Sequence, residues 1–306
     1  PLVELLSCAP ELLAQPEYAP LMCRVWEETV LLAPEDVLHA FGMSVFGAMA
    51  PMVGHPNSPV IMEPIFAIDM HVRALSTASL SAMADIMRAT HLDEAIFASL
   101  CRESDMYHVL QRCAILVSRM ALTMPPPMFH DMVRATASWP DLCRRLISTS
   151  ATLSLARSRK LVALALAHML RHASAQDKGL LSAVPDMIGM WTEVVGEVVE
   201  DEAGSADRYE RELSPTRALE IGEDGIPFLD EFGLIEAAPT PSSARTDAVR
   251  SRDPSFNVPL RAYVADTLNA VLQNGSYKTQ LQSLLATIDP LVLDTLQRGL
   301  SERPVA

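Results

Sequence analysis

Apolar residues recur at intervals of three and four along most of the chain, and turns that contain proline separate the runs that carry this period. Between residues 20 and 32, for example, Leu21, Val25, Trp26 and Val30 follow helical spacing. Proline and two acids at residues 34–36 are typical of the first turn of a helix. Sustained two-residue alternation rich in Val, Ile and aromatics is nearly absent, so the pattern predicts an all-α chain.

The expected helices are each about as long as one arm of a helical hairpin. They cover residues 2–15, 20–32, 34–50, 59–75, 80–90, 93–103, 105–123, 126–136, 140–148, 156–172, 178–200, 260–273, 277–286 and 290–300. Starts near Pro20, Pro59 and Asp105 are about forty residues apart, which is the period of HEAT-type repeats. The predicted fold is therefore an α-α superhelix, a HEAT-repeat solenoid of about six antiparallel helix pairs.

Length and composition favour such an array. A chain of 306 residues exceeds the size at which one compact core keeps growing. Leu, Ala, Met and Val dominate the 49% hydrophobic fraction, whereas aromatics make up 5% and there are 12 glycines. Because the chain begins at Pro1 inside what resembles the middle of an array, we expect it to be a fragment of a longer protein.

The stretch from Val37 to Met62 contains no Asp, Glu, Lys or Arg. Its first part is long enough to span a membrane. Pro51, Pro56 and Pro59 interrupt it, however, and no basic residues flank it. A helix packed inside the solenoid, without membrane insertion, is the favoured interpretation.

The net charge of -14 and the pI of about 5.0 argue against direct binding of nucleic acid, which needs clustered Lys and Arg, and favour basic protein partners. The cysteine count is five, an odd number without Cys-x-x-Cys spacing. We expect these cysteines to be small buried hydrophobic side chains in a reducing compartment.

Acidic residues concentrate after the long helix that ends near Val199. Fourteen acids face three arginines between Glu193 and Glu236, a local balance of -11. The sequence therefore predicts three parts: HEAT-like repeats over 1–202, an acidic insertion or loop containing Pro and Ser over 203–256, and a helical cap of the same solenoid over 257–306.

The acidic tract has two interpretations, a solvated loop or an electrostatic lure for basic cargo. Its candidate partner-contacting residues are Glu200, Asp201, Glu202, Glu223, Asp224, Asp230 and Glu231. Inside it lies a short apolar cluster that we expect to dock onto a groove of the same chain. Its candidate docking residues are Phe228, Leu229, Phe232, Leu234 and Ile235.

Catalytic and metal-binding patterns are weak. His168 and His172 share a helical face, but no third ligand of suitable spacing is near them. Residues 42–46 resemble a nucleophile elbow only until Phe46, where glycine is required. Met120, Met124, Met128 and Met132 follow at four-residue steps, which favours core packing over a binding groove. We expect no catalytic residue, no metal and no cofactor.

Two segments resemble a known family. Residues 158–166, Ser-Arg-Lys-Leu-Val-Ala-Leu-Ala-Leu, are similar to a helix start that recurs in late repeats of importin-β-type karyopherins. The stronger resemblance combines the acidic loop with Thr240-Pro241, Arg245, residues 250–254 (Arg-Ser-Arg-Asp-Pro) and residues 260–264 (Leu-Arg-Ala-Tyr-Val). This order resembles the C-terminal part of the importin eleven branch.

The resemblance implies a nuclear transport receptor that shuttles between nucleus and cytoplasm. It would bind protein cargo on its inner surface, touch phenylalanine-glycine nucleoporins in the nuclear pore and release cargo under control of Ran GTPase, mainly through repeats N-terminal to this chain. A HEAT-repeat scaffold subunit of another multiprotein complex is the alternative. An enzyme is a third possibility and requires a polar pocket that collects distant residues.

Overall fold

The computed structural model describes residues 2–55, 60–102, 106–174, 176–204, 245, 248–249, 252–273 and 277–301. Every regular element in these residues is a helix. The helices are α1 (Leu2–Ser7), α2 (Ala9–Leu13), α3 (Ala19–Leu32), α4 (Pro34–Gly54), α5 (Met62–Ala74), α6 (Thr77–Ala89), α7 (Leu92–Cys101), α8 (Tyr107–Thr123), α9 (Pro126–Thr136), α10 (Trp139–Ser150), α11 (Ala156–Arg171), α12 (Lys178–Leu181), α13 (Val184–Gly204), α17 (Pro254–Asn257), α18 (Leu260–Gln273), α19 (Lys278–Leu285) and α20 (Pro290–Ser301).

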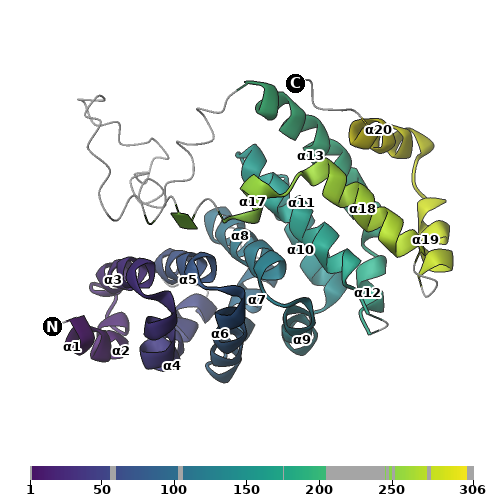
Figure 1. Cartoon of the computed structure of the whole chain (residues 1–306). Helices are drawn as coiled ribbons and strands as arrows, with labels where there is room; N and C mark the ends of the chain where they lie inside the picture. Colours follow the sequence, from purple (N-terminus) through teal and green to yellow (C-terminus); the bar gives the residue numbers. More distant parts are fainter. Residues whose placement is uncertain are drawn as a thin grey trace.

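The helices stack in two layers, which confirms the predicted all-α solenoid. One layer contains α3, α5, α8, α11 and α18, each packed against the next, and the other contains α4, α7, α10 and α13. The array bends so that the layer of α3, α5 and α8 lies on its inner side (Figure 1). Short helices α6 and α9 lie in the connections and pack against the outer layer. Successive inner helices begin at Ala19, Met62, Tyr107 and Ala156, a step of about forty-five residues.

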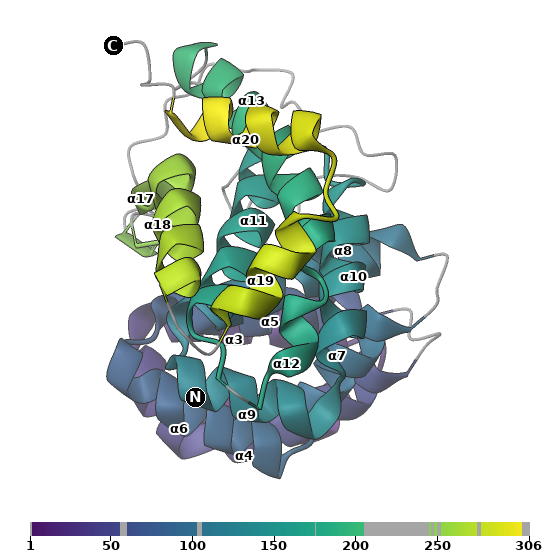
Figure 2. The same ribbon diagram turned by 90° about the vertical axis from the view of Figure 1, so that its right-hand side faces the viewer.

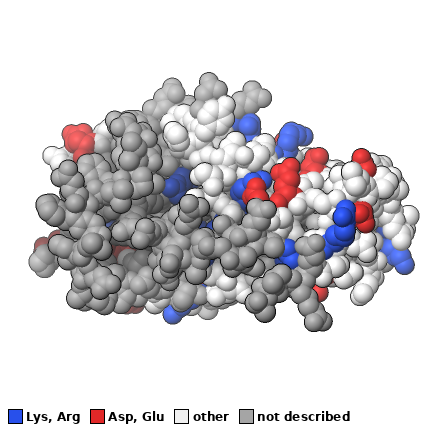
Figure 3. All heavy atoms as spheres, turned by 90° about the horizontal axis from the view of Figure 1, so that it is seen from above, with Lys and Arg blue, Asp and Glu red and all other residues white. Residues whose placement is uncertain are grey.

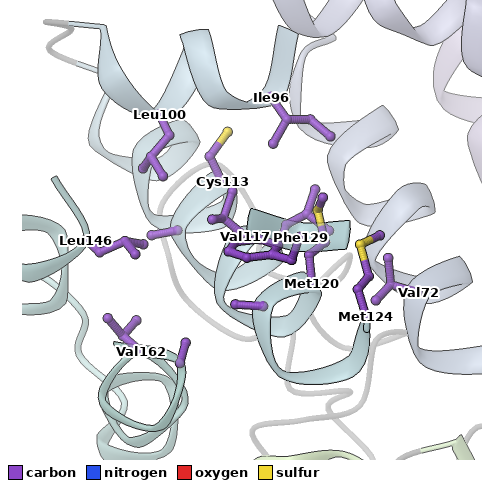
Figure 4. Packing of buried hydrophobic residues seen from close by; sticks show 14 of the residues in the cluster. Val72, Ile96, Leu100, Cys113, Val117, Met120, Met124, Phe129, Leu146 and Val162 are labelled. Carbon is purple, nitrogen blue, oxygen red and sulfur yellow. The ribbon is translucent and has the colours of Figure 1, made fainter. Parts of the chain in front are cut away.

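The core runs continuously between the layers. Around α8, Cys113, Val117, Met120 and Met124 point into the same packed region as Phe129 of α9 (Figure 4). Each of these five side chains is at most 2% exposed. The methionine pattern at four-residue steps therefore belongs to the core, as its spacing predicts, with Met132 fully buried and Met128 packed against the cluster.

Helix α4 is long and apolar enough to cross a membrane by length and composition. In the array it packs against α2, α5, α6 and α7, and it buries Val45, Phe46, Met49 and Val53. The helix passes through Pro51 and ends at Gly54, one turn later than expected, because Pro51 still accepts a hydrogen bond from the His55 N–H at 3.1 Å.

The C-terminal helices close one end of the array. Helix α20 packs on α13 and α18, while α19 joins α18 and α20 (Figure 2). Trp191 fixes α13 to α11, since its indole N–H donates to the Ala163 carbonyl oxygen at 3.1 Å. Most of the predicted 203–256 segment lies outside the described residues. Beyond that segment the structure describes residues 252–273, which begin just before α17, and residues 277–301.

Three expectations at the level of single elements are wrong. The first predicted helix is split at Cys8 into α1 and α2, and Cys8 is exposed, whereas Cys23, Cys113 and Cys143 are buried as expected. The predicted helix over 178–200 is two helices, α12 and α13, separated by a turn. Helix α17 has no counterpart among the predicted elements, because its four residues are too few to carry a helical period.

Candidate protein-binding surface

A cluster of four charged side chains lies on the inner layer where α5, α8 and the start of α17 meet. Asp69 and Arg73 come from α5, Arg119 from α8 and Asp253 from the N-cap position of α17. The Arg119 Nε and Nη2 atoms lie 3.0 and 2.9 Å from Asp253 Oδ2. Arg119 also pairs with Asp69, and Arg73 bonds Asp69 at 2.8 Å. Two arginines and two carboxylates therefore balance each other inside the protein.

Because this cluster is buried, the charges of its members strongly affect each other's pKa. Arg119 and Asp253 each have 2% side-chain exposure. Burial alone would raise the pKa of Asp253, but the Arg119 and Arg73 guanidinium groups hold that pKa far below its usual value. Burial would likewise lower the pKa of Arg119, and the carboxylates of Asp253 and Asp69 raise it instead. Asp253 and Arg119 thus stay charged across the physiological range.

Helix α17 is held by the other oxygen of the same carboxylate. The Ser255 N–H and hydroxyl donate to Asp253 Oδ1 at 2.9 and 2.7 Å, which is the geometry of an N-cap. One turn later, the Arg157 guanidinium of α11 lies 3.4 Å from the centre of the Phe256 ring. The segment that follows the insertion is therefore anchored to α5, α8 and α11 on the inner face.

Two acids at the N-terminal flank of the predicted acidic tract make contacts between helices. Glu193 and Glu197 of α13 both pair with Arg159 of α11, Glu193 at 3.2 Å. These two acids belong to the negative stretch but serve helix packing. Glu200, Asp201 and Glu202 lie on the last turns of α13, and their side chains are outside the described structure.

The remaining candidates of that tract also lie outside the described residues. These are Glu223, Asp224, Asp230 and Glu231, together with the docking candidates Phe228, Leu229, Phe232, Leu234 and Ile235. Figure 3 views the molecule from the inner side, and on its described part acidic and basic residues stand next to each other among uncharged areas. That part of the face carries no extended field of a single sign.

A second polar group supports the turn between α11 and α12. Asp177, whose side chain is fully buried, accepts from the Ser174 N–H at 2.8 Å, the Trp139 indole at 2.9 Å and Arg134 at 3.0 Å. His130 Nδ1 lies 3.0 Å from Asp177 Oδ2, the oxygen that also accepts from Ser174. Burial would raise the pKa of Asp177, but the Ser174 and His130 hydrogen bonds lower it to about 2.

A shallow pocket of about 350 Å³ opens beside this carboxylate, lined by Pro126, Pro127, His130, Arg134, His172, Ser174 and Asp177. The hydrogen bonds of Asp177 reach Ser174 of the same connection and side chains of α9 and α10, so the arrangement stabilises packing. His168 is likewise engaged, with Nδ1 2.6 Å from the Tyr263 hydroxyl of α18. Burial lowers the pKa of His168 to about 4. Within the described residues, no group of three or more His, Cys, Asp or Glu is placed to hold a metal ion.

Sequence reasoning missed the role of Arg119. A signal existed, because Arg119 interrupts the apolar run of residues 113–122, where a lone charge at a core-facing position needs a partner. Its partner Asp253 lies 134 residues away, so spacing gave no indication of the pair. Asp253 was singled out only within the Arg-Ser-Arg-Asp-Pro resemblance.

Comparison with protein families gives a match that covers nearly the whole chain. A family model described as importin-11-like, TPR repeats, matches residues 1–301. The comparisons with curated proteins and with solved structures find no match. The family description names TPR repeats, whereas the step of about forty-five residues between inner helices is nearer the HEAT period. On this match the chain belongs to the importin-11-like family, a family of nuclear transport receptors.

Proposed function

We propose that the chain binds basic protein cargo on the inner face of its helical array, as part of a receptor that carries this cargo through the nuclear pore. The observation that supports the proposal most is the family match over residues 1–301. A solenoid contacts mainly its sequence neighbours, so it presents a long curved face that different cargoes can share.

The position of the acidic tract fits this role. The tract follows α13 and precedes Asp253, and the structure fixes both of these flanks against α11 or its inner neighbours. A local balance of -11 between two such anchors attracts basic proteins over a range that salt shortens, since the Debye length is about 8 Å at physiological ionic strength.

Two further interactions belong to the proposal. RanGTP releases cargo through a coupling between two sites of the array. Phenylalanine-glycine nucleoporins bind in shallow apolar slots between outer helices. Together they let the receptor shuttle between cytoplasm and nucleus.

A pull-down tests these interactions. The immobilised receptor, in a form that includes the repeats N-terminal to this chain, is incubated with linker histone as a lysine-rich cargo, with hydrolysis-deficient Ran loaded with GTP or GDP, and with a phenylalanine-glycine repeat domain. We expect capture of the histone and of the repeat domain, and loss of the histone with Ran-GTP only. If the protein binds neither Ran-GTP nor the repeat domain, transport by this chain is refuted and a scaffold role is favoured.

A charge variant tests the acidic tract. Neutralising Glu200, Asp201, Glu202, Glu223, Asp224, Asp230 and Glu231 to the corresponding amides should weaken histone binding and flatten its salt dependence. The matched control neutralises seven exposed acids outside the tract: Glu11, Glu17, Asp36, Asp85, Asp186, Asp266 and Asp294. Equal affinity and equal salt dependence of the tract variant and the wild type would exclude the tract from cargo capture.

A further inference from the structure

Two carboxylates lie without partners in the inner layer, where α3 packs against α5 (Figure 1). Glu27 lies in the middle of α3 and is only 9% exposed. Glu63 lies in the first turn of α5, and its Oε2 atom is buried without a hydrogen bond. No hydrogen bond or ion pair to Glu27 occurs among the residues that the structure describes.

The lack of partners at Glu27 and Glu63 contrasts with the paired acids elsewhere in the inner layer. A buried carboxylate is costly unless it is paired or hydrogen-bonded, and Asp69 and Asp253, one helix further along, meet that requirement with Arg73 and Arg119. Glu27 is buried as a whole and Glu63 has one buried oxygen, but neither pairs with a guanidinium among the described residues. The α3–α5 contact is therefore short of one positive charge.

The charges around Glu27 agree with this deficit. Burial raises the pKa of Glu27 to about 7. Arg24, on the same helix, lowers the pKa, whereas Glu28 of α3 and Asp69 and Glu63 of α5 raise it further. The balance of these neighbours is negative, and Arg24 is itself exposed and makes no ion pair with Glu27 within the described structure.

We propose that the contact between α3 and α5 binds the ammonium group of a partner's lysine between Glu27 and Glu63. The inference rests on the proposed function, because the lysine belongs to the basic cargo. It adds a defined contact on the inner face, near the N-terminal end of the array.

Lysine fits this pair of carboxylates better than arginine. Its ammonium is a compact charge with three N–H donors on a flexible four-carbon stem, so it can reach carboxylates that are almost covered. The planar guanidinium needs a carboxylate with both oxygens open to a bidentate approach. Glu27 and Glu63 come from different helices, with one oxygen of Glu63 closed off, which suits separate hydrogen bonds from one ammonium group.

Binding is coupled to a proton. At neutral pH a share of the molecules carry a proton on Glu27, and the arriving ammonium favours the ionised carboxylate. The O–H bond of Glu27 breaks, its proton goes to the buffer and the ammonium keeps all three of its own protons. The complex therefore releases a fraction of a proton near pH 7, about half where pH equals pKa.

The test uses a fluorescein-labelled peptide of alternating lysine and glycine, titrated against the whole chain and followed by anisotropy. The test variant is Glu27→Gln with Glu63→Gln. The matched control is Glu11→Gln with Glu17→Gln, which removes the same charge from exposed positions at the same end of the array. Calorimetry at pH 7 in two buffers of different ionisation enthalpy counts the protons released.

We expect the Glu27/Glu63 variant to bind the peptide about tenfold or more weakly, because charge-assisted hydrogen bonds are lost. The control should stay within about twofold, since exposed charges are largely screened. Proton release should vanish in Glu27→Gln, and a peptide with acetylated lysines should not bind the wild type.

The outcomes separate the two proposals. If the wild type binds the peptide and the Glu27/Glu63 variant binds it equally well, the lysine site is wrong and basic cargo binding stands. If the variant and the control weaken binding alike, the effect is one of net charge and the site is again wrong. If the wild type does not bind the peptide at all, both proposals fail.

Discussion

Replacing Asp253 by asparagine tests the anchor that returns the chain to the inner face. Asparagine has nearly the same shape and is as good an N-cap residue as aspartate, so the cap of α17 survives and only the charge is removed. Arg119 then loses one of its two carboxylate partners while it remains buried at 2% exposure. The substitution therefore isolates the ion pair.

The cost follows from the burial of Arg119. Removing one partner of a buried pair costs about 3–5 kcal/mol, because an uncompensated charge stays in the interior. Asp69 still pairs with Arg119 and Arg73, so the cost should be somewhat smaller than that range, about 2–4 kcal/mol. Asp253→Ala loses the N-cap as well and should cost about 1 kcal/mol more.

Urea unfolding followed by circular dichroism at pH 7 measures these differences. Asp294→Asn is the control, since its pair with Arg298 at 2.9 Å is largely exposed, and it should change the unfolding free energy by less than about 0.5 kcal/mol. Limited proteolysis should cut Asp253→Asn near α17 sooner than the wild type.

The contribution of Asp253 to the unfolding free energy should change with pH in one direction. The pKa of Asp253 is held below 3.8, so its stabilisation is fully present above pH 3.8 and is lost as pH falls further. Wild type and Asp253→Asn should therefore differ at pH 7 and converge in acid. Equal unfolding free energies at pH 7, within about 0.5 kcal/mol, would refute the view that Asp253 neutralises Arg119.

Three further substitutions extend the test to other parts of the array. In urea unfolding, Glu27→Gln should stabilise the protein by about 1–3 kcal/mol at pH 8 and should leave the unfolding free energy unchanged at pH 4.5. The reason is that a folded pKa of about 7 makes the stability of the wild type fall as pH rises from 4.5 to 7. A pH-independent difference would contradict this. Leu164→Ala, at a fully buried position of α11, should lower the unfolding free energy by about 2–5 kcal/mol, and a loss under 1 kcal/mol would mean that the site collapses around the cavity. Asp177→Asn should cost about 2–3 kcal/mol at pH 7, with the difference disappearing as pH drops from 3.8 towards 2, and thermal unfolding across that range measures it.

Periodicity predicted the helical array because the period of three and four is set by local geometry. Helix α9 has the predicted bounds, Pro126–Thr136, and α8 and α18 end at the predicted residues, since proline or polar turns mark them. Short helices are the exception. Cys8 separates α1 from α2, and the one signal for this break is Pro10 in the first turn of α2, which the prediction of a single helix over 2–15 passed over. Helix α17 has four residues, little more than one turn.

Candidate contacts were harder to predict, because they depend on pairs distant in sequence. The sequence drew attention to excess acid, yet Glu193 and Glu197 turn out to pair with Arg159 across two helices. Glu27 looked like any other acid on an amphipathic helix. Only the packing of α5 against α3 shows that it is buried and unpartnered.

The separation of Arg119 and Asp253 has a consequence during translation. Asp253 leaves the ribosome 134 residues after Arg119, which at 5–20 residues per second is roughly 7–27 seconds later. Helices α5 and α8 can dock long before then, since their contacts are local. Until Asp253 arrives, two arginines on α5 and α8 share the single carboxylate of Asp69, and the inner groove of the nascent chain is open to any acidic segment, including that of a chaperone or of a neighbouring nascent chain.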